Sequence, residues 1–449
     1  MTAVRSMMII EFIDSMIFQQ LQQFRQIIYD GCLGKAKDVM FELMDAVLTS
    51  PSTPSFVNLS QNPIFRRQWS SIYAALHDGQ IYRSKLRRHL VSQVAVESQP
   101  ILAVDSSLWL RPEAKTLKDR GFHHNSGQGI GVGHSYSTLA WIPEESRSWV
   151  LPLRHERITS FETALTKASF QLKQVCRQLK VRPLVVFDRH YGNGSFLKQT
   201  AEIPADLLIR LASNRCVYGK PEAYSGRGAP RKHGHKFKLN DPQTHPEPQI
   251  IVEVEDSKLG LVKVSLWSQF HFRNCSTRPM EVIRVEVIKP SGQRRKFKPL
   301  WLVWTGQTRP MLSQLWCKYL RRFSLEHWYR FAKQRLFWTK PKLSSNQAGE
   351  IWGDLITIMS WQLWLARSEC TDNPLPWQST QKVLSPGRVA QAFPTIIAVI
   401  GTMANPPKTR GKSPGRKKGQ FPPSRPRYPT VKKRVSRRKK LKSTLKVVT

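Results

Sequence analysis

The spacing of apolar and polar positions divides the chain into helical ends and a middle section of short strands. Up to about residue 92, apolar residues recur at helical spacing in three runs, Met8–Tyr29, Ala36–Leu48 and Phe65–Leu90. From Gln99 the period shortens, and three segments have the character of strands: PILAVDSSLWL, GIGVGHSYSTLAWI and SWVLPLRHERI. We therefore expect a helical N-terminal domain over residues 1–95 that precedes a sheet.

Helices and strands alternate after this meander. SFETALTKASFQLKQVCRQL predicts a helix, RPLVVFDRHYGNGS a short buried strand and a turn, and DLLIRLAS a further strand after a short helix. The expected order over residues 96–214 is β-β-β-α-β-α-β, which indicates an α/β fold.

Residues 215–304 depart from this alternation. A basic loop, GKPEAYSGRGAPRKHGHKFK, leads into four alternating runs, IIVEVE, LVKVSLWSQFHF, EVIRVEVIKP and PLWLVWTG. Alternation with period two is typical of strands, so we expect a β-rich insertion here. Residues 305–403 return to helical spacing and are expected to complete the α/β core.

The helical segment YLRRFSLEHWYRFAK, residues 319–333, has an unusual polar face. Tyr319, Arg322, Glu326 and Lys333 stand at offsets 0, 3, 7 and 14. On one continuous helix, at about 100° per residue, these side chains fall within an arc of about 60°. One carboxylate would thus lie among three groups able to bind phosphate. A solvated charged stripe is the alternative explanation of such a face.

The net charge of the chain indicates the kind of partner that it binds. The chain has 449 residues and a formal net charge of +40, which calls for a polyanionic partner; nucleic acid is the first expectation and an anionic membrane surface the second. Residues 404–449 form a basic tail, with 17 Lys or Arg and no Asp or Glu from 405 onward. Such a composition is typical of disorder until a polyanion binds.

Other signals argue for a protein of the cell interior. The six cysteines form no C-x-x-C pair, so they indicate neither a zinc cluster nor a disulfide framework. The apolar N-terminus is interrupted by Glu11 and Asp14, and no run reaches the roughly 18 apolar residues of a spanning helix. We expect a soluble protein with no membrane partner.

Three carboxylates stand out by position. Asp105 is expected at the end of the first strand, Asp188 at the end of the strand after the long helix, and Glu326 on the helix behind the insertion. An Asp that ends an apolar strand is costly to desolvate unless it faces an open site or a cation. A turn or helix cap is the alternative for each alone, whereas together they predict a site for Mg²⁺, with Mn²⁺ as the alternative ion.

In this order the residues resemble the DDE triad of transposases with an RNase H-like, or retroviral-integrase-like, catalytic core. The spacing Tyr319-(2)-Arg322-(3)-Glu326-(6)-Lys333 is similar to the Y-(2)-R-(3)-E-(6)-K signature of bacterial insertion-sequence transposases. A β-rich insertion between the second Asp and the Glu also fits that family. The resemblance covers about residues 98–370 and leaves the N-terminal domain and the tail outside.

The resemblance implies a function for each position. Asp105, Asp188 and Glu326 would hold two divalent ions, which activate a water and later a DNA 3′-hydroxyl and stabilise the leaving 3′-oxygen. Arg322, Lys333 and Tyr319 would hold the DNA end. A flipped base would stack on a tryptophan of the insertion, for which Trp301 is the first candidate beside Trp267 and Trp304, although a buried core position is the alternative.

The expected activity is cut-and-paste DNA transposition: cleavage of double-stranded DNA at terminal inverted repeats and strand transfer into target DNA. A homodimer would assemble on two ends, in the nucleoid-associated cytoplasm of a prokaryotic cell. Two alternatives share the core, a domesticated DNA-binding protein without catalysis and a structure-specific DNA nuclease.

Overall fold

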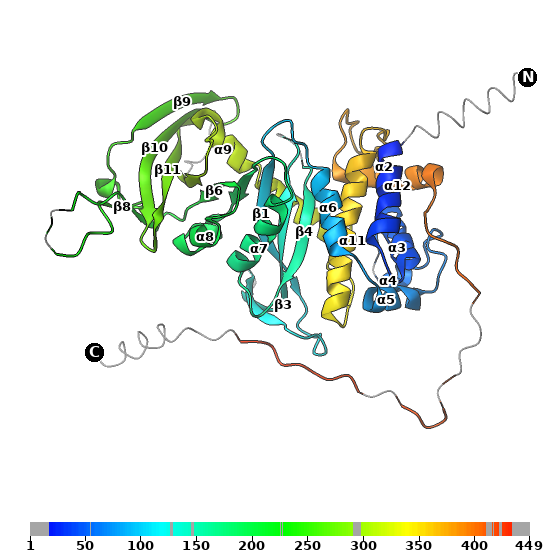
Figure 1. Cartoon of the computed structure of the whole chain (residues 1–449). Helices are drawn as coiled ribbons and strands as arrows, with labels where there is room; N and C mark the ends of the chain where they lie inside the picture. The colour runs from blue at the N-terminus through cyan, green and yellow to red at the C-terminus, as the bar shows by residue number, and fades with distance from the viewer. Residues whose placement is uncertain are drawn as a thin grey trace, which may run out of the picture.

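The computed structural model describes residues 18–53, 55–125, 129–144, 148–224, 226, 228–290, 298–409, 415, 417–421 and 424–432 (Figure 1). Residues 8–17 of the first predicted helix and residues 433–449 of the basic tail lie outside this part of the chain. Within it, no helix is both long and apolar enough to cross a membrane.

The centre of the molecule is a mixed sheet with helices between its strands. Three strands are antiparallel, and two further strands run parallel to the first, which gives the order β4-β3-β1-β5-β6. These strands are β1 (Ile101–Leu110), β3 (Gly129–Trp141), β4 (Leu151–Ile158), β5 (Leu184–Phe187) and β6 (Asp206–Arg210). All four residues of β5 are buried and apolar, as expected for an inner parallel strand.

Helices connect these strands in the predicted order. Helix α7 (Ala164–Cys176) joins β4 to β5, and α8 (Gly194–Gln199), preceded by a 3₁₀ turn at Arg189–Tyr191, joins β5 to β6. Thr163 caps α7 through a reciprocal capping box with Thr166. The mixed α/β architecture is thus confirmed, and the large mixed sheet is consistent with an RNase H-like core.

The first strand is longer than its apolar run predicts. The expectation that β1 ends at Asp105 is wrong, because Ser106–Leu110 continue the strand by pairing with β3 as far as Gly133. The segment between β1 and β3 also contains an additional strand, β2 (Gly121–Asn125), which forms a hairpin with β3. Asp105 therefore lies in the middle of β1.

The strands expected over residues 215–304 continue the same sheet. Strand β12 (Leu300–Thr305) pairs with β6, and β11 (Cys275–Pro290) pairs with β12, so one 12-stranded sheet runs through both regions. The remaining strands are β7 (Cys216–Tyr218), β8 (Lys236–Lys238), β9 (Ile250–Asp256) and β10 (Gly260–Phe272), with a 3₁₀ turn at Pro242–Thr244. This region lies beside the core at the β6 edge (Figure 1).

The segment 319–333 is not one helix. Helix α9 (Leu312–Leu320) ends before Arg321, and α10 (Phe323–Gln334) begins after Arg322. Between them the backbone tightens, because the N–H of Arg322 bonds to the carbonyl of Tyr319 at 3.0 Å, a three-residue step. Tyr319 thus ends α9, whereas Glu326 lies in the first turn of α10 and Lys333 in its last turn.

Helices from both ends of the chain share one core on the β4 side of the sheet. Helix α11 runs between the sheet and the N-terminal helices (Figure 1). The buried Arg25 ties these parts together, since its guanidinium binds Asp45 at 2.7 Å and Gln362 at 2.6 Å. The helices of this layer are α2 (Gln19–Ile27) with a π-turn at Ile28–Cys32, α3 (Lys37–Thr49), α4 (Phe56–Leu59), α5 (Trp69–Asp78), α6 (Arg83–Ser92), α11 (Asn346–Ala366) and α12 (Pro386–Ile400).

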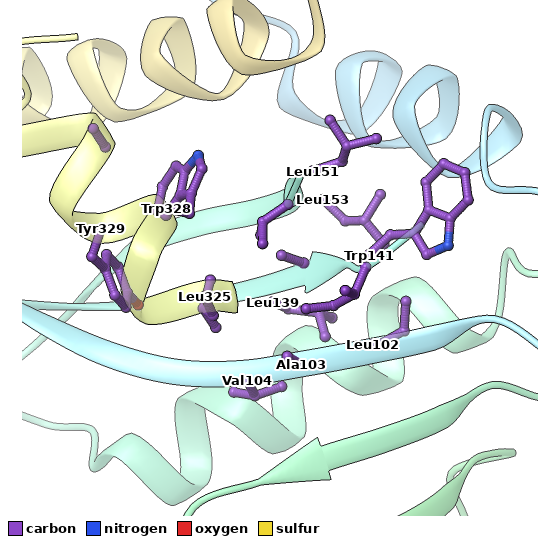
Figure 2. Close-up of a cluster of buried hydrophobic side chains, with 14 of the residues drawn as sticks. Leu102, Ala103, Val104, Leu139, Trp141, Leu151, Leu153, Leu325, Trp328 and Tyr329 are labelled. Carbon is purple, nitrogen blue, oxygen red and sulfur yellow. The ribbon is translucent and has the colours of Figure 1, made fainter. Parts of the chain in front are cut away.

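Helix α10 packs directly on the central strands. Figure 2 shows Leu325, Trp328 and Tyr329 of α10 against Val104 of β1 and Leu139 of β3. The buried face of α10 thereby fixes the position of its polar face relative to β1.

Part of the basic tail lies on the core. The N–H of Tyr428 donates to Lys115 O at 2.8 Å, and that of Val431 to Arg120 O at 2.7 Å. Val431 also forms a parallel bridge with Gly121 of β2. Residues 424–432 of the tail thus contact the core at Tyr428 and pair with the edge strand β2 at Val431, although the composition of the tail is typical of disorder.

Candidate active site

Two aspartates meet where β5 ends. The parallel ladder between β1 and β5 runs from Ile101–Leu184 to Val104–Phe187, so the next residues on the two strands are Asp105 and Asp188. Asp188 then leaves the sheet as the residue before the 3₁₀ turn. The register thus brings together two carboxylates that are 83 positions apart in the sequence (188 − 105).

Helix α10 adds Glu326 and Arg322 to this pair. The Nη1 atom of Arg322 donates to Asp105 Oδ2 at 3.2 Å, and its Nη2 atom donates to Glu326 Oε1 at 2.8 Å. Arg322 is buried, with 3% of its side chain exposed, whereas Glu326 is 52% exposed. A planar fork of donors suits this geometry, since it binds two carboxylates at once.

Charge crowding is visible in the titration of Asp105. Burial raises the pKa of Asp105 to about 6; the Ser106 N–H and the Arg322 charge oppose this rise, and the charges of Asp188 and Glu326 add to it. Asp188 and Glu326 thus both lie close enough to repel the Asp105 carboxylate. A bound cation would relieve that repulsion.

The donor set fits a hard divalent ion in its chemistry. Asp105, Asp188 and Glu326 offer only carboxylate oxygens, which Mg²⁺ and Mn²⁺ prefer. In this conformation no three acidic, histidine or cysteine side chains among the described residues stand close enough to hold an ion. Glu326 instead accepts a hydrogen bond from Arg322, and about half of its side chain is exposed.

Tyr319 and Lys333 differ in their relation to the carboxylates. The Tyr319 hydroxyl is buried beside the Arg322 guanidinium, whose charge opposes the rise that burial causes in the Tyr319 pKa. Lys333 is half-buried at the far end of α10, with its Nζ 5.7 Å from the Trp338 ring centre, and burial lowers its pKa. The helix break therefore leaves Tyr319 and Arg322 together and Lys333 apart.

Trp301 lies in a cavity that reaches the site. A cavity of about 1140 Å³ between the core and the insertion is lined by Asp188 and by Trp301. Its wall is strongly basic, through Arg189, Arg210, Arg215, Arg284 and Lys298. Trp301 is only 4% exposed, and the Arg284 guanidinium lies 5.4 Å from its ring centre. Trp267 and Trp304 are buried as well and do not line this cavity.

Three residues near Asp105 had no signal in the sequence that pointed to the site. Tyr329 binds the Asp105 backbone, and Thr138 and His155 lie behind it. The basic wall of the cavity could be predicted in part from the sequence, because Arg189 directly follows Asp188. Arg210, by contrast, comes from β6 and reaches the cavity only through the fold.

Comparison with known proteins agrees with this geometry. Residues 29–269, more than half of the chain, match a family model described as DDE superfamily endonuclease. The match includes Asp105 and Asp188 and ends before segment 319–333. No curated protein matches the chain. DDE enzymes generally use divalent metal ions and act on DNA. The chain belongs to the DDE superfamily endonucleases.

Proposed function

We propose that this endonuclease is a cut-and-paste DNA transposase of the insertion-sequence type, which cleaves the ends of its own element and joins them to target DNA. One observation carries the proposal: Asp105 and Asp188 adjoin at the end of β5, and Arg322 joins Asp105 to Glu326, in a chain with a net charge of +40. The order and spacing of these residues support a transposase within the broader family.

Each residue has a proposed task at the phosphodiester. Asp105, Asp188 and Glu326 would hold two divalent ions, Mg²⁺ or Mn²⁺. When bound, these ions would supply activation of a water or a DNA 3′-hydroxyl and stabilisation of the leaving oxygen. Before the ions bind, the Arg322 guanidinium balances the charge of Asp105 and Glu326, because it binds both carboxylates. Releasing Glu326 from Arg322 would free that carboxylate for a cation.

The basic cavity is the proposed binding site of the DNA end. Asp188 lines this cavity, so we propose that the cavity lies next to the reacting phosphate; its arginines and Lys298 suit a phosphate backbone. We propose that Trp301 stacks on an unpaired base there, since it lines the cavity whereas Trp267 and Trp304 do not. Arg284 would have to leave its place on the Trp301 ring to admit that base.

Lys333 and Tyr319 are proposed to act on the DNA end in different ways. Lys333 follows Glu326 by seven residues on the same helix, which corresponds to roughly 10 Å along the helix axis. At that distance Lys333 could bind the phosphate next to the one at Glu326. Tyr319 is 1% exposed, so its hydroxyl would act on the DNA through Arg322 unless α9 moves. The proposed working form is a homodimer on two ends in a prokaryotic cell, with residues 404–449 adding contacts to the backbone.

The decisive experiment combines the full chain, Mg²⁺ and DNA that carries the terminal inverted repeats of the element. We expect cleavage at the repeat ends and joining of the 3′ ends to a target plasmid. Glu326→Gln should abolish both steps and leave end binding intact, whereas Glu253→Gln on the exposed edge strand β9 should behave as the wild type. Cleavage without joining would indicate a structure-specific nuclease, and binding without cleavage a domesticated DNA-binding protein.

A further inference from the structure

Asp105 is the first residue in a row of polar side chains that crosses three strands. Asp105 of β1 stands directly opposite Thr138 of β3, and Thr138 stands directly opposite His155 of β4. Residues paired in this way project on the same face of an antiparallel sheet, with their Cβ atoms about 5 Å apart. Thr138 is fully buried and His155 nearly so, which makes a polar row in this position costly unless it is hydrogen bonded.

Tyr329 of α10 joins the row to the Asp105 backbone. Its hydroxyl donates to the carbonyl oxygen of Asp105 at 2.8 Å and lies 2.8 Å from Thr138 Oγ1. The Tyr329 hydroxyl is the donor to both oxygens, so its single proton is shared between them. The Nδ1 atom of His155 is 2.8 Å from the same Thr138 oxygen and completes a chain of three hydrogen bonds.

His155 stands at the far end of the hydrogen-bond chain. Thr138 Oγ1 accepts from Tyr329, so its own proton is available to Nδ1 of His155, 2.8 Å away. The Nε2 atom of His155 is buried without a partner in the described residues. Burial lowers the pKa of His155 to about 3, so the imidazole stays neutral at any working pH.

Aromatic rings hold His155 in place. Its ring lies 4.5 Å from that of Trp338, 5.1 Å from that of Tyr136 and 5.4 Å from that of Trp328, measured between ring centres. Gly353 of α11 admits this packing, because a Cβ at that position would come 3.1 Å from His155 Cδ2. The far end of the hydrogen-bond chain is therefore rigid.

Asp105 needs such support more than its neighbours do. Beyond Val104 strand β1 has no partner in β5, since the ladder ends at the Val104–Phe187 pair. From Asp105 onward the described strand is held by β3 on one side only. Figure 2 shows Tyr329 pointing from α10 toward β1 at this place. The same helix carries Arg322 at its start and Glu326 in its first turn.

We propose that Tyr329, Thr138 and His155 are positioning residues, which form a hydrogen-bonded relay that sets the Asp105 carboxylate at the correct distance from Glu326 for metal binding. The inference rests on the proposed function, in which Asp105 is a metal ligand. Tyr329 is the central member, because it connects β1 to α10 and so couples two of the three carboxylates.

The test measures Mn²⁺ binding to the full chain by electron paramagnetic resonance, beside the rate of end cleavage. Residues that orient metal ligands typically change metal affinity or activity by about 10–100-fold when mutated. We expect Tyr329→Phe to weaken Mn²⁺ binding by about tenfold or more and to lower kcat, with end-binding affinity unchanged. Thr138→Val should have a smaller effect in the same direction, and Thr138→Ser should restore the wild-type behaviour because it keeps the hydroxyl.

Tyr136→Phe is the matched control, since it removes a hydroxyl from a buried ring that stacks on the same His155. It should leave Mn²⁺ affinity unchanged. The inference is overturned if Tyr329→Phe binds Mn²⁺ like the wild type, or if Tyr136→Phe weakens binding equally, which would indicate general loosening of the core.

The metal measurement also separates this inference from the proposed function. A wild type that binds Mn²⁺ but does not cleave repeat ends would contradict the transposase while the affinity series still tests the relay. If Asp105→Asn leaves Mn²⁺ binding intact, Asp105 is not a ligand and the relay is overturned with it.

Discussion

Arg322 lies where it can hold Asp105 in the place of a cation, with 3.2 Å between its Nη1 atom and Asp105 Oδ2. Burial alone would lower the pKa of Arg322, but Tyr319, the charge of Asp105 and the hydrogen bond to Glu326 raise it overall. The guanidinium is thus the counter-charge of the carboxylates in the absence of an ion.

Arg322→Ala should therefore make the protein more dependent on Mg²⁺. Without the guanidinium the carboxylates repel one another, so Tm should fall in metal-free buffer and rise more on Mg²⁺ addition than it does in the wild type. Differential scanning fluorimetry across a Mg²⁺ series measures both effects. Arg309→Ala, which removes the partner of Glu281 away from the site, should show no change in its Mg²⁺ response. An equal or smaller Mg²⁺ response in Arg322→Ala would contradict the idea that Arg322 replaces a cation.

A second buried carboxyl predicts a pH dependence of stability. Asp354 on α11 binds Arg83 at 2.7 Å, yet burial raises the pKa of Asp354 to about 6 despite that charge. A carboxyl with a raised pKa contributes stability below its unfolded pKa of about 3.9, and this contribution is lost as the pH rises toward 6. Two pKa units correspond to about 3 kcal/mol.

Asp354→Asn removes this titration, so its Tm relative to the wild type should increase from pH 4 to pH 7. The Arg83 side chain is 45% exposed and remains hydrated in the variant. Asp30→Asn, at a more exposed ion pair with Lys37, is the comparison for the loss of a surface carboxylate. A Tm difference between Asp354→Asn and the wild type that does not change with pH would contradict the raised pKa of Asp354.

The positions of Asp188 and β5 could be predicted from local sequence, because the buried run LVVF ends at a polar residue and a turn. The full length of β1 could not, since Ser106–Leu110 are extended by pairing with distant β3. The helix break at Arg321–Arg322 also has no local signal, because the amphipathic period continues through it. Tyr329 and Thr138 are 191 residues apart, so only the folded chain reveals their contact.

A substitution at Lys333 should weaken DNA binding without affecting metal binding. Its side chain is half-buried beside Trp338, away from the hydrogen bonds that join Arg322 to the carboxylates. Lys333→Ala should weaken binding of repeat-end DNA and reduce the slope of log affinity against log salt by about 1, the value for one lost phosphate contact.

Mn²⁺ affinity should be unchanged in Lys333→Ala, in contrast to Asp105→Asn. Fluorescence anisotropy at several salt concentrations gives the slope. Lys340→Ala, an exposed lysine beyond the end of α10, provides the comparison for a general loss of charge. An unchanged salt slope together with weaker Mn²⁺ binding would place Lys333 with the carboxylates instead of the DNA.

The docked part of the tail predicts a change in protease sensitivity. The N–H of Val431 donates to Arg120 O at 2.7 Å, and the Lys118 ammonium lies 5.0 Å from the Tyr428 ring centre. Val431→Pro removes that donor, so the strand-like pairing at Gly121 should be lost and the tail released. Trypsin should then cleave after Arg427 several-fold faster, since a protease acts on extended, undocked chain. Val431→Ala keeps the N–H and should be cleaved at the wild-type rate, and neither variant should shift Tm measurably because Val431 lies outside the buried core. Equal cleavage of Val431→Pro and wild type would mean that residues 424–432 are not held on β2 in solution.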